Sequence, residues 1–409
     1  MLTTRGVAVF LAGLAMWAAA RLIGSPGLEV AALGLGALPF LAVGMARFAK
    51  PRLTIRRRLS DVRVPPGTRV TVELSIENRA AASTSLLLIE DRFPAPLGRF
   101  ARVVVSGLHG RSSRRVTYTL VPQTRGRYRI GPLSVDLSDP FWLTRQRVEF
   151  DETEELLVTP EIEDLTQAPE PATGGTFGSS RARQLFRTGE DFYTMRQYQL
   201  GDDLRRLHWP SVARTGSLMI RQDETSKRAS GLVFLDSRQA ALGGAHTPAF
   251  ERAVSVAASV GLLLARGGFT LRLATADSAP AGVTEDQFLD ALAGVEPGTS
   301  RSIGPALTYL RAGASPDTAL VLVSAPPVPS ELTSLLRAGS GFGPKLAIFV
   351  HPADPDALAP ERKAQLEGRA TQARIALTRA GWDFLVLPPS TRLLERWHTP
   401  RERLSAPVG

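Results

Sequence analysis

Two long apolar segments open the chain. Residues 7–20 and 30–46 contain no charged side chain, and a short Ser-Pro-Gly break lies between them. A hydrocarbon core of roughly 30 Å needs about 20 apolar residues in a helix, a length that the first segment reaches if Arg21 snorkels. A signal peptide followed by a core helix is the alternative, but Arg21 interrupts the expected cleavage region. We therefore predict a transmembrane α-helical hairpin over residues 1–50.

The pattern then changes to a period of two. In residues 69–78, Val, Leu and Ile alternate with Thr, Glu and Ser, which predicts a strand with one buried and one wet face. Similar runs follow at 86–93 and 114–122, separated by Pro and Gly residues. About seven or eight strands at this spacing predict an all-β antiparallel sandwich of immunoglobulin-like shape over residues 51–160.

One segment of this β region ends in aromatic residues. Residues 125–143 read as a strand that ends in a turn at Asp139 and Pro140. Phe141 and Trp142 follow this turn. Because large aromatic side chains contribute most to a core when they are buried, we expect both of them to be core residues rather than a platform for a ligand.

The last part of the chain, residues 229–409, alternates apolar strands with helical segments. Strands without polar alternation are typical of a parallel sheet that is covered on both faces. The helix over 248–266 has Thr247 and Pro248 before it and two glycines after it, which are start and stop signals. We predict an α/β domain whose strands are 231–236, 270–277, 319–326, 345–352 and 382–389, and whose remaining helices are 285–292, 303–311, 330–337 and 360–380.

Charge is distributed unevenly along the chain. The net charge is +10, and the first 150 residues hold 22 Lys/Arg against 9 Asp/Glu, whereas residues 229–409 hold 17 against 16. Between the two regions, residues 161–186 form an acidic linker rich in Pro and Gly. A positive excess near the N-terminus suits membrane lipid better than nucleic acid, so lipid is an expected partner and nucleic acid is not.

A basic cluster follows the second apolar segment. Residues 47–58 contain six Lys/Arg and no acidic residue. The positive-inside rule places such a cluster in the cytoplasm, and each basic residue near an anionic leaflet contributes about 1 kcal/mol of attraction. We expect a multi-pass protein of the cell membrane whose soluble domains are cytoplasmic.

Residues 187–228 concentrate charged and aromatic side chains without a helical period. The planar fork of arginine suits fixed carboxylate partners, so a rigid ion-pair network is one interpretation. The alternative is a hydrolase that uses the acidic residues and His208 within residues 190–208, since carboxylates and an imidazole serve hydrolysis. The arginines in the same stretch favour neutralised carboxylates. We therefore expect no catalytic residue and no enzyme activity.

A spaced pattern within this segment carries a family resemblance. It consists of Arg196, Tyr198, Gly201, Asp202, Asp203, Arg205, Arg206, Trp209, Ala213, Arg214 and Arg221. The pattern closely resembles the signature of the uncharacterised family called domain of unknown function 58, and the wider layout is similar over essentially the whole chain. The resemblance implies a von Willebrand factor A-like fold for residues 229–409, and it makes the signature residues candidates for partner binding or for a structural role.

The resemblance also implies partners. Family members are typically encoded beside MoxR-type AAA+ ATPases and often beside transglutaminase-like membrane proteins. The chain has no phosphate-binding loop of its own, so any use of ATP would belong to another chain. We expect a non-enzymatic membrane-anchored scaffold or adaptor whose cytosolic part docks a MoxR-type AAA+ ATPase or its client.

The metal site of a von Willebrand factor A domain is degenerate in this sequence. That site resembles Asp-x-Ser-x-Ser after the first strand, because hydroxyl and carboxylate oxygens at alternate positions converge on one hard cation. Asp236 is instead followed by Arg238 and Ala240 at the serine positions, and a later strand ends in Ser324 and Ala325 without the expected aspartate. The absence of cysteine also excludes thiolate metal sites. We expect no metal and no cofactor, with Asp236 either paired with Arg238 or capping a helix.

Overall fold

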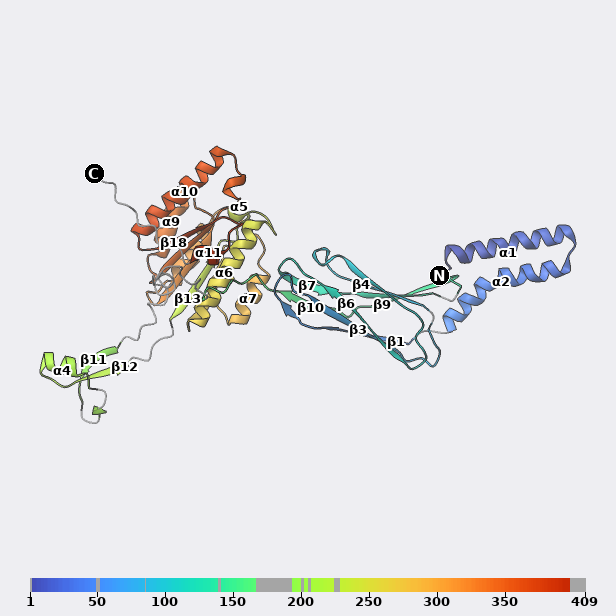
Figure 1. The fold of residues 1–409 in the computed structure, drawn as a ribbon, viewed down its shortest axis with the longest axis horizontal. Coiled ribbons are helices and arrows are strands. Elements are labelled where there is room, and N and C mark those ends of the chain that lie inside the picture. Colours follow the sequence, from blue (N-terminus) through green and yellow to red (C-terminus); the bar gives the residue numbers. More distant parts are fainter. Residues whose placement is uncertain are drawn as a thin grey trace, which may run out of the picture. The chain divides into compact units, whose positions relative to one another are not determined.

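The computed structural model describes residues 2–48, 52–84, 86–138, 141–166, 193–199, 202–204, 207–223 and 229–397 (Figure 1). Of residues 45–48, 193–196 and 221–223, it describes the backbone alone. The chain divides into two compact units, Met1–Thr159 and Pro160–Gly409, and each is treated by itself below.

The first unit begins with a pair of helices, α1 (Thr4–Ile23) and α2 (Pro26–Phe48). Gly24 ends α1 in a left-handed conformation with φ 69°, which favours glycine and allows the chain to reverse. The helices approach closely at Gly13, where an added Cβ would lie 2.7 Å from the amide nitrogen of Gly36. Both helices are long and apolar enough to cross a membrane, and most of their side chains are not buried inside the protein. The sequence prediction of two apolar N-terminal helices is therefore confirmed.

Strands β1 to β10 form the β-domain, residues 52–159. They make three sheets of order β1-β3-β6, β2-β10-β7 and β5-β4-β8-β9. The apolar positions of β3 alternate as predicted and are completely buried, and they belong to one core that all three sheets share. The bounds are β1 Leu53–Leu59, β2 Arg63–Val64, β3 Val70–Asn78, β4 Leu87–Arg92, β5 Phe100–Val105, β6 Ser113–Leu120, β7 Gly126–Ile130, β8 Leu133–Ser138, β9 Arg145–Phe150 and β10 Glu154–Val158.

The segment 125–143 differs from its prediction. It forms two strands, β7 and β8, rather than one. The break lies at Gly131, whose φ of 118° leaves the extended region, and at Pro132, which has no amide hydrogen to donate to a ladder. The predicted turn at Asp139 and Pro140 lies outside the described residues.

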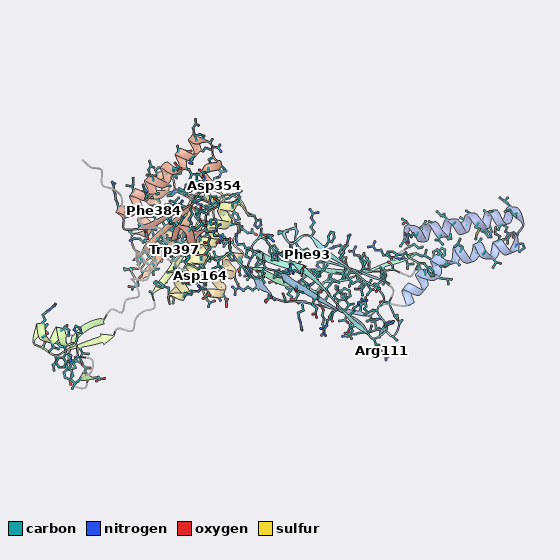
Figure 2. All side chains as sticks on the ribbon, in the orientation of Figure 1. Phe93, Arg111, Asp164, Asp354, Phe384 and Trp397 are labelled. Carbon is teal, nitrogen blue, oxygen red and sulfur yellow. The ribbon has the colours of Figure 1, made fainter. Side chains whose placement is uncertain are left out.

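The expectation that Phe141 and Trp142 are core residues is wrong. Phe141 is 69% exposed and Trp142 is 46% exposed. The backbone of Trp142 takes φ 60°, and its carbonyl oxygen accepts a hydrogen bond from the Thr3 hydroxyl at 2.6 Å. The core of the β-domain is filled instead by aliphatic residues, by Tyr128 and by Phe93, whose ring stacks on that of Tyr118. Figure 2 labels Phe93 in this domain.

The basic cluster of residues 47–58 also needs a correction, because Arg57 is not available to lipid. Its side chain is 4% exposed and pairs with Asp91, whose side chain is 1% exposed. The Arg57 guanidinium donates from Nε to Asp91 Oδ2 at 2.9 Å, and Nη1 donates to the carbonyl oxygens of Ile130 and Glu152 at 3.0 Å. The Tyr118 hydroxyl donates to the same carboxylate at 2.7 Å, and burial next to the Asp91 charge raises the pKa of this phenol, so it stays protonated.

The α/β domain, residues 229–397, contains a six-stranded sheet of order β15-β14-β13-β16-β17-β18. The strands run parallel except β15, which pairs antiparallel at the edge, so the sheet is mixed. Helices lie on both faces of the sheet (Figure 1), and an apolar core fills each side. Helix α6 is long and apolar enough to cross a membrane, but 78% of the residues in its apolar stretch are buried inside the domain, so it is a core helix.

Each strand and helix that the sequence predicts for this domain is present, with ends that agree within two residues. The strands are β13 Ser230–Leu235, β14 Thr270–Thr275, β15 Ala281–Gly282, β16 Thr318–Ser324, β17 Lys345–Val350 and β18 Asp383–Leu387. The helices are α5 Gln239–Leu242, α6 Pro248–Arg266, α7 Glu285–Ala293, α8 Gly304–Ala312, α9 Pro329–Gly339, α10 Pro360–Arg379 and α11 Leu393–Trp397. Sequence analysis did not predict β15, α5 or α11, which are short.

The first residues of the predicted linker pack against the α/β domain, whereas residues 167–186 lie outside the described residues. Glu163 forms an ion pair with Arg252 of α6 at 2.8 Å and accepts hydrogen bonds from the amides of Leu393 and Leu394 in α11. Leu165 is buried in the same apolar core as Trp397 of α11. Asp164, the residue before Leu165, and Trp397 are both labelled in this domain in Figure 2. The domain therefore includes residues 161–166.

Candidate functional site

Polar side chains meet at the carboxyl edge of the parallel strands. Ligand sites of open α/β sheets lie at this edge, because the loops that follow neighbouring strands converge there. Asp236 directly follows β13, Ser324 ends the neighbouring strand β16, and Glu331 lies in the first turn of α9. The side chain of Arg238 joins them, and we call these four residues the Arg238 cluster.

The Arg238 cluster is buried and fully hydrogen-bonded at its centre. Arg238 donates from Nε to Asp236 Oδ1 and from Nη2 to Asp236 Oδ2, both at 2.8 Å, which is a bidentate pair. Its Nη1 donates to Glu331 Oε1 at 2.7 Å, and the Ser324 hydroxyl donates to Asp236 Oδ2 at 2.7 Å. The Asp236 side chain is 0% exposed and that of Arg238 is 4% exposed. One guanidinium therefore holds two carboxylates together, of which Asp236 is out of contact with water and Glu331 is 23% exposed.

The charge state of Arg238 follows from these contacts. Burial alone lowers the pKa of the guanidinium, but hydrogen bonds and charge from Asp236 and Glu331 outweigh burial and raise that pKa above its usual value. Arg238 is therefore a permanent cation at any physiological pH. A group that never releases a proton cannot act as a general acid or base in this site.

These residues do not fit a divalent cation. Both carboxylate oxygens of Asp236 already accept from the Arg238 guanidinium, and a cation at the same position would lie beside a buried positive charge. Of the two alternatives that the sequence left open for Asp236, pairing with Arg238 is the one observed. Within the described part of the chain, no group of three or more His, Asp or Glu side chains is arranged to hold a metal ion.

Sequence analysis missed Glu331 as a member of the cluster. Its only sequence signal is that it lies near the start of the helix predicted over 330–337, where an acidic residue is favourable next to the helix N-terminus. Its contact with Arg238 depends on β13 and β16 being neighbours in the sheet, and the residue pattern does not give strand order. The same edge also brings the Ser237 hydroxyl within 3.2 Å of Asp277 Oδ2.

A buried histidine follows β17 at the same edge of the sheet. His351 is nearly inaccessible, and its Nδ1 has no hydrogen-bond partner among the described residues. Burial lowers the pKa of His351, and the nearby Glu367 and Asp354 charges offset this effect only in part. His351 is therefore neutral in the folded protein at pH values where an exposed histidine takes up a proton.

His351 gives the first prediction, a pH dependence of stability. Because the folded-state pKa is lowered, the unfolded chain binds the proton first as the pH falls below about 6.5. The free energy of unfolding should be fully retained above this pH and should decrease below it, by at most about 1.4 kcal/mol per pH unit. Urea unfolding of the full chain in detergent at several pH values measures the slope. His351→Gln should remove this contribution, while His109→Gln, an exposed site, should keep it; equal slopes in both variants would contradict the prediction.

The family signature segment forms a two-stranded ribbon with a short helix. Strands β11 (Tyr193–Gln197) and β12 (Met219–Asp223) pair antiparallel, with Arg196 opposite Ile220 and Met195 opposite Arg221. Helix α4 (Trp209–Thr215) lies between them in sequence and ends at Gly216, whose φ is 67°. The amide of Tyr198 donates to the Leu218 carbonyl at 2.8 Å, which extends the ribbon by one more pair.

The structure places the predicted signature residues unevenly. Gly201, Arg205 and Arg206 lie outside the described residues, and of Arg196 and Arg221 only the backbone is described. The ion-pair network depends on these residues and stays a prediction. The described signature side chains are those of Tyr198, Asp202, Asp203, Trp209, Ala213 and Arg214.

The acidic residues that motivated a hydrolase have local roles where they are described. Asp202 Oδ2 accepts a hydrogen bond from the amide of Gln199 at 2.9 Å, which is a turn within the segment. His208 Nδ1 lies 2.9 Å from the Ser211 hydroxyl in the first turn of α4. Glu190 and Asp191 lie outside the described residues, so the hydrolase alternative stays a hypothesis.

Apolar side chains of the signature segment face solvent. Trp209 is 67% exposed, and Leu204 and Leu218 are also exposed. Arg214, which lies in the last turn of α4, is exposed as well. Single exposed apolar residues are common on proteins, but tryptophan and arginine are the residues most enriched in the centres of protein interfaces. This combination makes the segment a candidate docking surface.

Solved structures resemble parts of the chain at low similarity. The CARDB domain of a Pyrococcus furiosus protein, solved with di-metal ions, has 18% identity and a TM-score of 0.20 and covers 26% of this chain and 93% of its own. A chain in the complex of zinc 2-glycoprotein with prolactin-inducible protein from human seminal plasma has 13% identity and a TM-score of 0.21, covering 27% of this chain and 97% of its own. At these TM-scores the likeness carries no argument about fold or function.

Sequence comparison gives one family and no characterised relative. No curated protein matches the chain. The matching family is one whose members have no assigned function. The matched region is residues 194–379, and it includes the described parts of the ribbon, α4 and the Arg238 cluster. It matches the model of the family described as "Protein of unknown function DUF58", and this match supports the assignment of the chain to that family.

Proposed function

We propose that this protein is a non-enzymatic, membrane-anchored scaffold whose cytosolic part docks a MoxR-type AAA+ ATPase or its client. In this proposal the β-domain is an immunoglobulin-like spacer and the α/β domain is a von Willebrand factor A-like module. A transglutaminase-like membrane protein is a further candidate partner. The proposal combines the family resemblance with three properties of the described residues.

The first supporting property is the N-terminal helix pair. Its apolar side chains are largely exposed, a state that is unfavourable in water and favourable in lipid. The basic residues of 47–58 other than Arg57 favour a cytoplasmic position for everything after α2. Arg21 and Glu29, which lie 3.6 Å apart beside the turn between the helices, would then face the opposite side.

The second supporting property is the chemistry of the Arg238 cluster. Its groups bind one another, and the permanent charge of Arg238 makes acid–base and metal chemistry unsuitable there. A closed ion-pair cluster at the edge where α/β folds usually bind ligands supports an interaction module rather than an enzyme.

The observation that carries the proposal is the exposure of Trp209 in the family signature. An indole ring that is 67% exposed adds little to the stability of the isolated chain, so its value lies in contact with another molecule. Removal of a central interface tryptophan typically costs 2 kcal/mol or more of binding free energy, which is about a 30-fold loss of affinity.

The test is capture of a purified MoxR-type ATPase by the full chain in detergent. We expect the native chain to bind the ATPase and Trp209→Ala to reduce the affinity by about 30-fold without a change in melting temperature. Tyr309→Ala, which removes an exposed aromatic from α8, is the matched control and should bind like the native chain. No binding by the native chain, or equal binding by the two variants, would contradict the proposal.

A further inference from the structure

A cavity of about 440 Å³ opens where α1 begins, within the first unit. The start of α1 lies beside the β8–β9 end of the β-domain (Figure 1). The polar and aromatic residues that line the cavity are Thr3, Thr4, Arg5, Asp136, Ser138, Trp142 and Arg145. None of them belongs to the Arg238 cluster or to the family signature.

Backbone contacts fix the two walls of this cavity relative to each other. The amide of Thr3 donates to the Leu143 carbonyl at 2.9 Å, and Leu2 forms an isolated bridge with Thr144. The Thr3 hydroxyl donates to the Trp142 carbonyl and also caps α1 by accepting from the amide of Gly6. Trp142 is held in a left-handed conformation, φ 60°, that is uncommon for a bulky residue. The loop before β9 is therefore tied to the first turn of the apolar hairpin.

One side of the cavity is suited to a phosphate. The first turn of α1 presents the amides of Thr4 and Arg5 and the positive end of a 20-residue helix. The Arg5 and Arg145 side chains line the same space, and both are substantially exposed. Hydrogen bonding to Asp136 raises the pKa of Arg145, so this arginine stays charged.

The other side of the cavity offers a hydrogen-bond acceptor. The Asp136 side chain, on β8, is 6% exposed and pairs through Oδ2 with Arg145. Its second oxygen, Oδ1, is buried and has no hydrogen-bond partner among the residues that the structure describes. A buried carboxylate oxygen without a donor is unfavourable, so this atom favours a ligand that brings one.

We propose that this cavity binds the headgroup of a phospholipid that carries both a phosphodiester and a primary ammonium group, as phosphatidylethanolamine does. The phosphate would lie against Arg5, Arg145 and the start of α1, and the ammonium would donate to Asp136 Oδ1. The inference rests on the proposed membrane anchor, because only a spanning α1 brings the cavity to the lipid headgroups. Exposed Trp142 lines the cavity, and aromatic residues of this kind are enriched at membrane interfaces.

The chemistry separates this ligand from other lipids. Phosphatidylcholine has the same phosphodiester, but its quaternary ammonium has no N–H to donate. Phosphatidylglycerol has the phosphodiester and hydroxyl donors but no positive charge to meet the Asp136 carboxylate. The Asp136 carboxylate attracts an ammonium through opposite charge as well as through a hydrogen bond, whereas it attracts a hydroxyl through the hydrogen bond alone, so a preference for the primary ammonium is expected.

The test is lipid titration of the full chain in detergent, read by native mass spectrometry, with three lipids of identical acyl chains. We expect phosphatidylethanolamine to bind about tenfold more tightly than phosphatidylcholine or phosphatidylglycerol. Arg145→Gln and Arg5→Gln should each weaken phosphatidylethanolamine binding, and Asp136→Asn should abolish the preference over phosphatidylcholine. Arg129→Gln, an exposed strand arginine outside the cavity, is the control and should bind like the native chain.

Several outcomes would overturn the inference. Equal affinity for all three lipids, tighter binding of phosphatidylglycerol, or equal behaviour of Arg145→Gln and Arg129→Gln would each contradict a specific headgroup site. Competition by millimolar inorganic phosphate would point to free phosphate as the ligand. Arg5→Gln keeps the test valid if Asp136→Asn fails to fold, since Arg5 is exposed. Sedimentation of the full chain with phosphatidylcholine vesicles reports the anchor separately, so a failed anchor and a failed headgroup site are distinguishable.

Discussion

Arg238→Ala is expected to destabilise the α/β domain by about 3–5 kcal/mol, because it leaves a buried carboxylate without its cation. Asp236 is inaccessible to water, and both of its oxygens accept from Arg238. Glu331 loses the same partner but is partly exposed and can be solvated. The loss should therefore come mainly from Asp236.

Urea unfolding of the full chain in detergent measures this change. Arg337→Ala, an exposed arginine of α9, is the matched control and should change the free energy of unfolding by no more than about 0.5 kcal/mol. The double variant Asp236→Ala with Arg238→Ala should be less destabilised than Arg238→Ala alone, because it removes the charge that the single variant leaves unpaired. Equal stability of the Arg238→Ala and Arg337→Ala variants would show that the cluster contributes little.

The α/β domain could be predicted closely because its strands are continuous apolar runs. β16, for example, is buried along its whole length, and only a strand between two neighbours with helices on both faces gives that pattern. The short edge strand β15 and helix α11 have no such pattern. Their positions depend on packing against residues far away in sequence, such as the contact of Glu163 with Leu393.

The β-domain shows where a sequence signal existed and was outweighed. Alternation in β1 puts Arg57 on the same face as Ile55 and Leu59, which are buried. This period indicates a buried arginine, but the run of three arginines also fits a basic cluster at a membrane, so the residue pattern alone supports both interpretations. Trp142 had no comparable signal, because its exposure follows from the hydrogen bond of its carbonyl to Thr3, a contact 139 residues away.

The candidate sites differ in how much of them the sequence could provide. Asp236 and Arg238 are two residues apart, so their pairing could be expected from the sequence. The cavity at the start of α1 joins residues 3–5 to residues 136–145, and no local pattern connects these segments. A site that depends on tertiary contacts between distant segments is found only once their packing is known.

Arg57→Gln should cost the β-domain about 3–5 kcal/mol, because the carboxylate of Asp91 is buried and would keep only the Tyr118 hydroxyl as its partner among the contacts described above. In the native chain, Arg57 donates to the carbonyl oxygens of Ile130 and Glu152, and these hydrogen bonds tie β1 to β7 and to the turn before β10. The same variant would remove this donor from both carbonyl oxygens. We expect a lower melting temperature and faster trypsin cleavage within residues 52–159.

The neighbouring arginines provide the control for this prediction. Arg56 and Arg58 are exposed on the same strand, so Arg56→Gln and Arg58→Gln remove the same charge from almost the same position without opening the core. If the three arginines acted together as a lipid-facing cluster, the three variants would weaken vesicle binding equally and would leave the melting temperature unchanged. Burial of Arg57 instead predicts that only Arg57→Gln lowers stability, and that Arg56 and Arg58 alone account for any salt-sensitive attraction of this strand to anionic vesicles.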